Sequence, residues 1–203
     1  YAVTTGDYNT ALSPSTLQRI TTASNNIAAG YGAMLYADNG STANTAYGTQ
    51  AAQGVSSNEF DRGTFLGYRA GFGITTGDNN IMLGYQSGDN ITSGSNNIAL
   101  GYNIDLPSAT ADDQLVIGNI IYGTGVDGTA TNYSSGNIGI GTNSPDQKLE
   151  VAGQVLATTF NGDGSALTAL PSGVMAIDDL SDASTSANDI AIGTRSYQKP
   201  FRA

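Results

Sequence analysis

Apolar and polar residues alternate in short phrases that recur along the chain. Residues 80–85 read NIMLGY, and residues 97–102 read NIALGY, 17 positions later. In each phrase one residue separates two large aliphatic residues, and this period of two is typical of a β-strand. Asn-Asn, Ser-Gly, Gly-Asp and Thr-Gly clusters flank the phrases and favour turns. The pattern therefore predicts short strands separated by tight turns.

The fifth residue of each phrase is glycine, and aligning the chain on this glycine reveals further copies. The spacings from the copy at Gly30 to the copy at Gly141 are 18, 19, 17, 17, 17 and 23 residues, and one more copy ends at Gly193. Glycine suits a corner of the backbone, or a close approach where a Cβ would clash. The predicted turn glycines are Gly30, Gly48, Gly67, Gly84, Gly101, Gly118, Gly141 and Gly193.

Short strands at a fixed period are the signature of stacked repeats. Nothing in residues 20–145 predicts a helix. We expect an all-β fold of stacked short-strand repeats, β-roll-like or β-prism-like, with about 17 residues per repeat.

The supply of large apolar residues is small. Leu, Ile, Val and Phe occupy 40 of 203 positions, close to the fraction at which chains become disordered. Each repeat adds two large aliphatic residues and a third, such as Ile74, which we judge too few for one chain to enclose a core. Three chains around one axis would gather roughly six such side chains per level, at ~1.5–3 kcal/mol each. We therefore expect a fibrous homotrimer, with a trimer core of Ile81, Leu83, Ile98, Leu100, Leu115, Ile117, Ile138, Ile140, Ile190 and Ile192.

Two polar or aromatic patterns accompany the repeat. Tyrosine follows the glycine at Tyr31, Tyr68, Tyr85 and Tyr102. We interpret these rings as an aromatic ladder between levels, with a row of sugar-binding platforms as the alternative. The Asn-Asn pairs suit turns or stacked amides better than ligand binding.

The charge balance excludes several partners. The net charge is −10, and only seven basic residues are present, whereas nucleic acids and anionic lipids are bound through clustered lysine and arginine. No apolar run approaches the ~20 residues of a membrane helix, so we expect no membrane insertion. The first residue is tyrosine, and we expect a processed chain or a piece of a longer one.

Catalytic and metal-binding chemistry has few candidates. The chain contains no histidine and no cysteine, which excludes Ser-His and Cys-His nucleophiles and the common zinc sites. Glycosidic cleavage needs only two carboxylates. Candidates for that pair are Glu59 with Asp61, Asp112 with Asp113, and Asp178 with Asp179. Candidate calcium-binding turns are residues 77–79, 88–90 and 162–164, which are also ordinary turn sequences. We expect no enzyme activity, no cofactor and no metal site.

Two stretches resemble known fibre proteins. GSNNIALGY and GDNNIMLGY are similar to the head repeats of trimeric bacterial adhesins and, in their spacing, to the shafts of phage tail fibres. Residues 136–170, GNIGIGTNSPDQKLEVAGQVLATTFNGDGSALTAL, resemble the junction segment of phage tail-fibre proteins, and residues 177–182 resemble another fibre-shaft phrase. The resemblance implies a homotrimeric, extended structural protein exposed on a virion or a cell surface.

These patterns divide the chain into five parts. We expect an irregular lead-in or attachment segment at 1–20, a repetitive β shaft at 21–122, a Gly/Thr-rich loop at 123–136 and a tail-fibre-like junction module at 137–170. Residues 171–203 form an acidic linker and a resumed repeat, DIAIGT, that suggests continuation beyond residue 203.

The expected function is a structural segment of a phage tail fibre that projects a host-receptor-binding region. Its partners would be two further copies of itself, other tail or fibre proteins at its ends, and a glycan or protein receptor on the host. A bacterial cell-surface adhesin or extracellular filament is the alternative, and a tailspike polysaccharide depolymerase is less favoured. The expected location is the virion, or the extracellular space and cell surface.

Overall fold

The structure is a computed structural model that describes residues 6–159, apart from residues 21, 39, 56 and 57. The chain divides into two compact units, Tyr1–Leu156 and Ala157–Ala203. The described residues belong almost entirely to the first unit. Ile190, Ile192, Gly193 and the Asp178–Asp179 pair lie outside the described residues.

Residues 6–156 form a single ten-stranded sheet whose strands follow one another in chain order. Among the described residues all regular structure is β-strand. Each strand is three residues long: β1 (Thr10–Leu12), β2 (Ile27–Ala29), β3 (Thr45–Tyr47), β4 (Thr64–Leu66), β5 (Ile81–Leu83), β6 (Ile98–Leu100), β7 (Leu115–Ile117), β8 (Ile121–Gly123), β9 (Ile138–Ile140) and β10 (Leu149–Val151).

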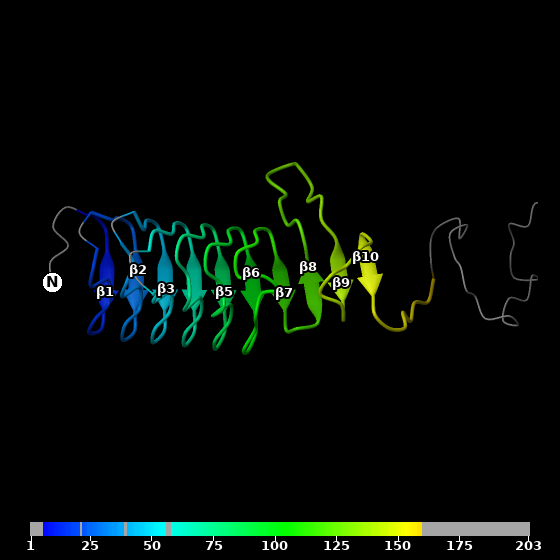
Figure 1. Ribbon diagram of the computed structural model, residues 1–203, viewed down its shortest axis with the longest axis horizontal. Coiled ribbons are helices and arrows are strands. Elements are labelled where there is room, and N and C mark those ends of the chain that lie inside the picture. The colour runs from blue at the N-terminus through cyan, green and yellow to red at the C-terminus, as the bar shows by residue number, and fades with distance from the viewer. Residues whose placement is uncertain (1–5, 21, 39, 56–57, 160–203) are drawn as a thin grey trace, which may run out of the picture. The chain divides into compact units, whose positions relative to one another are not determined.

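From β1 to β7 the chain winds as a β-solenoid, with one strand in each coil. Neighbouring strands are parallel and in strict register, so that Ile81 pairs with Ile98 and Ile98 pairs with Leu115. Figure 1 shows these strands side by side, with the rest of each coil looping back behind them. The expected all-β fold of stacked repeats, about 17 residues each, is confirmed.

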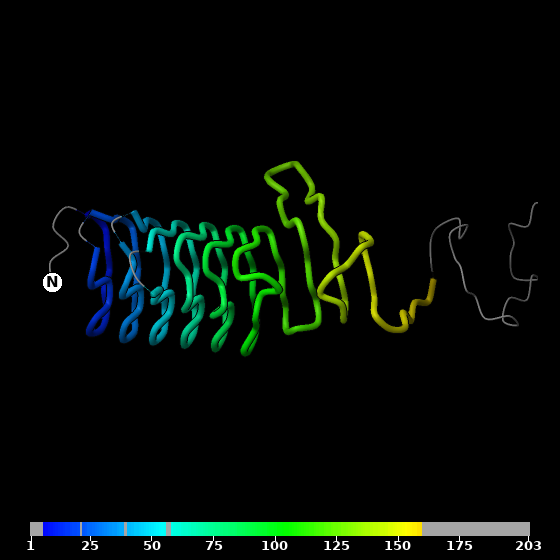
Figure 2. Tube along the Cα trace, viewed as in Figure 1, coloured from blue at the N-terminus to red at the C-terminus, as the bar shows by residue number. Residues whose placement is uncertain are grey.

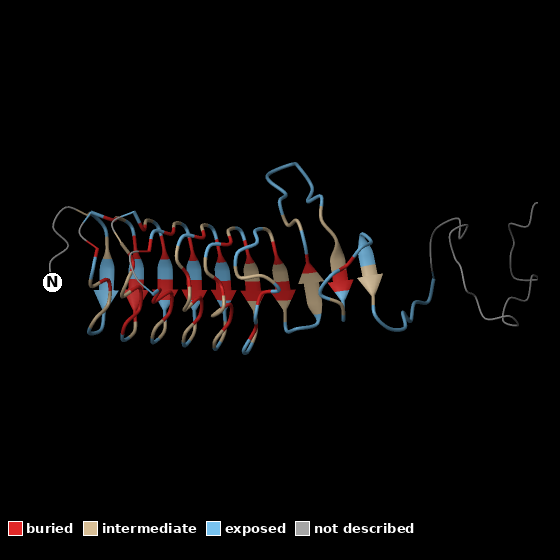
Figure 3. Ribbon diagram, in the orientation of Figure 1, coloured by how far each residue is buried: buried red, intermediate tan, exposed pale blue. Residues whose placement is uncertain are grey.

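The interior of the solenoid is filled by the middle residue of each strand and by the return segment of each coil. Phe65, Met82, Ala99 and Val116 are fully buried in this way, and Figure 3 shows the buried centres of the strands. Ile74, Ile91 and Ile104 cover them from the opposite side of the coil. The prediction that one chain has too few apolar residues to enclose a core is therefore wrong. The middle residue of each strand and an isoleucine of the return segment suffice to fill these coils.

Glycines make room for the larger core residues. A Cβ on Gly63 or Gly71 would lie 2.2–2.3 Å from the ring of Phe65. A Cβ on Gly88 would lie 2.2 Å from the sulfur of Met82. The core therefore keeps a constant cross-section by opposing a large side chain in the strand to a glycine in the return segment.

A second glycine column lies at the corner where each strand ends. From Gly30 to Gly101 the φ angles of the five glycines in this column lie between 124° and 140°, a region that residues with a Cβ avoid. At Gly84 an added Cβ would lie 2.0 Å from the carbonyl oxygen of Gly101 in the next coil. The corner therefore needs glycine both for its backbone angle and for the close approach of adjacent coils.

The opposite corner, where each strand begins, is held by a ladder of buried amides. The side-chain oxygen of Asn97 accepts hydrogen bonds from the backbone N–H and the side-chain N–H of Gln114, at 2.8 and 3.1 Å. Asn80 accepts from the N–H of Asn97 at 2.9 Å, and Asn26 accepts from the N–H of Asn44 in the same way. Each buried amide thus accepts a hydrogen bond from the backbone of the next coil, as expected for polar groups without access to water.

The solenoid begins earlier than the sequence pattern predicts. Strand β1 lies within residues 1–20, which we expected to be irregular, and it pairs in parallel with β2. Asn9 joins the amide ladder by accepting from the N–H of Asn26 at 3.0 Å. The repeat that contains β1 is not recognised in the sequence, because Ser13, with a φ of 125°, occupies the corner position that glycine holds elsewhere.

The parallel stacking stops after β7. The chain turns back at Gly118, and β8 pairs antiparallel with both β7 and β9. This reversal accounts for the longer spacing between Gly118 and Gly141. The loop between β8 and β9, residues 124–137, leaves the sheet as an arm, and Figure 2 shows it extending past the ends of the strands. Strand β10 resumes parallel pairing with β9.

Candidate functional site

The outer side of the sheet carries an exposed row of aliphatic side chains. The first and third residues of β5, β6 and β7 point away from the coil interior. Ile81 and Leu83 are 40% and 41% exposed, whereas Met82 between them is fully buried. We call this surface the aliphatic face, and its central members are Ile81, Leu83, Ile98, Leu100, Leu115 and Ile117.

The aliphatic face continues beyond the solenoid into β8 and β9. The register places Ile121 beside Ile117 and Ile140. Gly123 lies between Leu115 and Ile138, where an added Cβ would be 2.9 Å from the Cβ of Leu115. The change of strand direction therefore preserves the apolar surface. The eight predicted core residues that the structure describes all belong to it, and none is enclosed by the coils of its own chain.

The same surface is more polar toward β1. The first positions of β1, β3 and β4 are Thr10, Thr45 and Thr64. The third position is aromatic in β3, where Tyr47 is 61% exposed, and aliphatic in β4, at Leu66. In β2 the two positions are Ile27 and the small, buried Ala29. Large aliphatic residues fill both positions only from β5 onward in the solenoid, which makes β5 to β7 the most hydrophobic part of the face.

A short tyrosine ladder borders the aliphatic face. Tyr68, Tyr85 and Tyr102 each follow a corner glycine, and successive ring centroids lie 5.1 Å apart. The planes are inclined by 18° and 12°, so the rings stack nearly in parallel. Because Tyr85 has another ring on each side, its faces are occupied, and only the ring edges remain for a ligand. This geometry fits a ladder between coils better than a row of sugar platforms.

The carboxylates that we considered for glycosidic cleavage bond to neighbouring coils. Asp61 accepts from the N–H of Thr42, and Asp112 accepts from the N–H of Ser95, both at 2.7 Å. Asp113 accepts from the side-chain amide of Asn96 at 3.0 Å. These three side chains hold one coil to the next at the corner where the strands begin.

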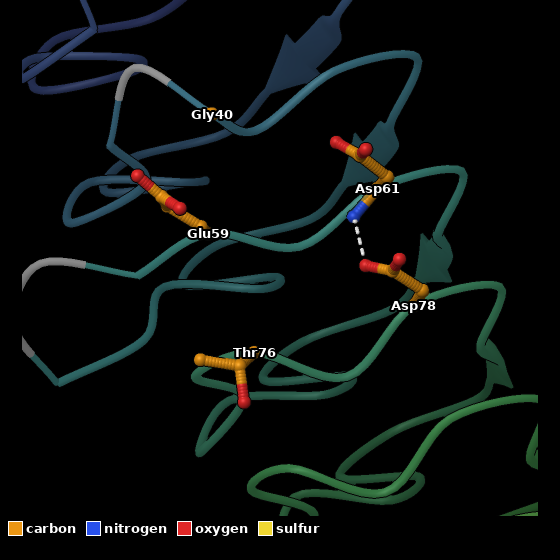
Figure 4. Close-up of a pocket in the computed structure, with 5 residues that line it drawn as sticks. All are labelled: Gly40, Glu59, Asp61, Thr76 and Asp78. Atoms are coloured by element: carbon orange, nitrogen blue, oxygen red, sulfur yellow. Dashed lines mark hydrogen bonds between the residues drawn. The ribbon is translucent and has the colours of Figure 1, made fainter.

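A shallow pocket of about 220 Å³ lies beside this corner and is lined by Gly40, Glu59, Asp61, Thr76 and Asp78. Figure 4 shows Asp78 accepting a hydrogen bond from the N–H of Asp61, at 2.9 Å. Arg62 pairs with both aspartates, at 3.5 and 3.1 Å. The guanidinium of Arg62 therefore neutralises part of the negative charge that a bound cation would require.

The turns considered for calcium have structural bonds of their own. Asp78 belongs to the pocket just described, and Asn90 bonds the backbone of Leu106 through both ends of its amide. Asp89 lies beside Asp105, and burial together with this neighbouring carboxylate raises the pKa of Asp105. Among the residues that the structure describes, no three acidic side chains converge to hold a metal ion. The third turn, residues 162–164, is outside the described residues.

Comparison with known proteins adds no family assignment. A scan against protein-family models, a search of the curated proteins and a search of the solved structures each found no match. Within residues 6–159 as described, no helix is present that has the length and apolar character to cross a membrane.

Sequence reasoning missed two features that bear on function. The arm at residues 124–137 was expected only as a Gly/Thr-rich loop, although its turn residues and Tyr133 were visible. The reversal at β8 was also missed, because β8 begins four residues after the end of β7 instead of a repeat length later, and its residues lack the alternation of two large aliphatic residues about a smaller one. The aliphatic face, the tyrosine ladder and the arm are the surfaces on which a function can be argued.

Proposed function

We propose that the chain is a structural segment of a homotrimeric fibre, with the aliphatic face of each copy packed against those of two others. The observation that carries the proposal is the outward orientation of the large aliphatic residues. In β5 to β7 the middle residue, which faces the coil interior, is methionine, alanine or valine, whereas isoleucine and leucine take the outward positions of the same strands. Contiguous apolar patches of this kind mark interaction sites.

The energetic gain from assembly is substantial. Burying the 40% of Ile81 and the 41% of Leu83 that remain exposed would contribute about 0.6–1.2 kcal/mol each. The same value for both outward residues of three coils in three chains gives an upper bound of roughly 10–20 kcal/mol, because the outward residues of β6 and β7 are less exposed than those of β5. Association costs about 4–15 kcal/mol for each partner brought together, or about 8–30 kcal/mol for the two partners that join the first chain, so this sum lies within the range of the total cost. The additional aliphatic residues in β8 and β9 favour assembly further.

Three-fold symmetry suits a face of this shape. A row of short strands in parallel register is narrow across the strands and long along the stacking direction. Three such rows can meet around one axis, so that each row contacts two others and no apolar edge stays exposed. In a dimer each row would contact only one other. Closed cyclic symmetry also gives every copy the same contacts.

The biological role that we propose is the shaft of a phage tail fibre that carries a host-receptor-binding region. Stacked coils around a shared dry axis cannot separate one at a time, so such a shaft transmits force and resists proteases and detergent. Support comes from the resemblance of GSNNIALGY and of residues 136–170 to fibre proteins. A cell-surface adhesin with the same trimeric architecture is the second candidate, favoured by the exposed tyrosine ladder.

Multi-angle light scattering of the purified chain tests the proposal directly. We expect three times the chain mass of 20.7 kDa, unchanged on dilution over the accessible concentration range. A stable monomer, folded by circular dichroism at the same concentrations, would refute the trimeric fibre. If the chain is a trimer, electron microscopy of particles labelled through this chain distinguishes a virion fibre from a cell-surface filament.

A further inference from the structure

The arm between β8 and β9 is an ordered projection. At its base the N–H of Thr124 donates to the carbonyl of Asn137 at 3.0 Å, and the N–H of Gly136 donates to Gly125 at 3.2 Å. The N–H of Val126 donates to the carbonyl of Asp113 at 2.9 Å. The last bond ties the arm to the corner at which β7 begins.

Polar contacts within the arm fix its conformation. The carboxylate of Asp127 accepts from the N–H and from the hydroxyl of Ser135, each at 2.8 Å, and these bonds lower the pKa of Asp127. Lys148, from outside the arm, donates to the carbonyls of Ser135 and Gly136. An arm that is already ordered gives up little conformational entropy when it binds.

The outer part of the arm ends in an uncovered tyrosine. Thr129 and Asn132 close a tight turn through a backbone hydrogen bond of 2.7 Å. The next residue, Tyr133, is 98% exposed. Nothing in the described part of its own chain packs against this ring, and an aromatic side chain held out in this way is typical of a binding contact.

The tyrosine ladder has an open end. Tyr102 is 75% exposed, compared with 40% for Tyr68 and 42% for Tyr85. The ladder stops there because the corresponding position in the next coil is Asn119, where the chain turns back into β8. One face of the Tyr102 ring, the one turned away from Tyr85, is therefore free for another aromatic ring.

Three-fold packing brings these two features together. In each chain the strands begin at one corner of the aliphatic face, where the arm projects, and they end at the other corner, where the tyrosine ladder lies. Around a closed three-fold axis, the corner where one copy's strands begin adjoins the corner where the next copy's strands end. The outer end of the arm also leans toward β7 in Figure 2, which is the level just beyond Tyr102.

We propose that the arm of each copy reaches the neighbouring copy and that Tyr133 stacks on the free face of that copy's Tyr102. The contact extends the neighbour's tyrosine ladder by one ring and joins the three chains outside the apolar axis. The inference rests on the proposed trimer. The partner is a second copy of this chain, and a soluble ligand on the arm is the competing occupant.

Cysteine cross-linking tests the contact, because the natural chain contains no cysteine. In the double variant Tyr102→Cys and Tyr133→Cys, a short bifunctional maleimide should link the chains into covalent dimers and trimers on a denaturing gel. Either single variant should remain monomeric on the gel, because the contact joins two different positions. The control pair Tyr102→Cys with Tyr8→Cys places a cysteine at an 84% exposed site in the first coil and should not cross-link.

A second measurement follows the loss of the ring itself. Tyr133→Ser should speed dissociation of the trimer about tenfold or more, because three aromatic contacts are lost, whereas Tyr133→Phe should retain the slow rate. A trimer by light scattering that neither cross-links nor responds to Tyr133→Ser would overturn the arm contact and leave the proposed trimer intact. A monomer would overturn both.

Discussion

Replacing Leu83 by aspartate should abolish assembly and leave the solenoid of each chain folded. Leu83 ends β5, and its side chain points away from the coil interior with 41% of it exposed. In a single chain an aspartate at this position meets water. In the proposed trimer, three carboxylates would meet at one level of a dry axis.

The magnitude follows from the burial of Leu83. Losing the leucine contacts removes about 0.6–1.2 kcal/mol from each chain, or about 2–4 kcal/mol from each level. Each carboxylate must then lose its water or take up a proton, and protonation at pH 7 costs about 4 kcal/mol. The total penalty on assembly is on the order of 14–16 kcal/mol, or about ten orders of magnitude in the association constant.

Light scattering and far-ultraviolet circular dichroism, measured on the same samples, separate assembly from folding. We expect Leu83→Asp to be a folded monomer at pH 7 that regains its trimeric mass as the pH approaches 4, where the carboxylates become neutral. Val55→Asp adds the same charge at a 58% exposed site outside the aliphatic face and should remain trimeric. Met82→Asp, at a fully buried site, should instead unfold the chain.

The opposite results would refute the assignment of the axis. A Leu83→Asp protein with the trimeric mass and thermal midpoint of the natural chain would mean that the aliphatic face does not form the interface. So would a variant that is monomeric but does not recover at low pH, because the penalty would then have another origin than charge.

Three further predictions concern the coil itself, and two of them have a matched control variant. Gly84→Ala should lower the free energy of unfolding by more than about 2 kcal/mol, measured by denaturant titration, because its Cβ would lie 2.0 Å from a carbonyl oxygen of the next coil; Gly118→Ala has open space around it and a φ of 58°, so it should cost only the backbone strain of about 1–2 kcal/mol. Asn97→Leu should cost about 1–3 kcal/mol, because it leaves the buried backbone N–H of Gln114 without an acceptor, while the Gln114 side chain keeps Ser108 and Ala111 as acceptors; Asn96→Ala, which removes only exposed side-chain bonds, should cost about 1 kcal/mol or less. Asp105→Asn should raise the thermal midpoint at pH 7, and the gain should vanish below about pH 4: because the pKa of Asp105 is raised in the folded chain, the natural protein loses stability as the pH rises through that value.

The strands and their period could be predicted from the sequence because a period of two survives in every well-formed copy. The two flanking aliphatic residues, such as Ile98 and Leu100, identify β6 without any structural knowledge. What they do not identify is the side of the sheet that the coil encloses. The size of Ile98 and Leu100 predicts that they face the core, whereas the coil encloses Ala99 between them and receives its large apolar side chains from the return segments, at residues such as Ile91 and Ile104.

The departures from the repeat were harder to foresee for a related reason. Ser13 adopts a backbone angle that elsewhere requires glycine, and only the pairing of β1 with β2 reveals that the position is equivalent. Strand β8 depends on contacts with β7 and β9 on both sides, and its three residues carry no signal for antiparallel pairing. The arm could be predicted as a loop, but its direction is set by the Val126–Asp113 bond, which no local pattern encodes.

The reversal at β8 has a consequence for unwanted polymerisation. Every parallel coil offers the next one the same row of backbone donors and acceptors, so β1 and an uncovered β7 would be complementary edges able to join end to end without limit. Antiparallel β8 covers the edge of β7 and thereby removes one of this pair of complementary edges. A chain shortened to end at Gly118 should form open-ended filaments visible by electron microscopy, and a shortened chain that stays at a fixed mass would show that β8 has no such role.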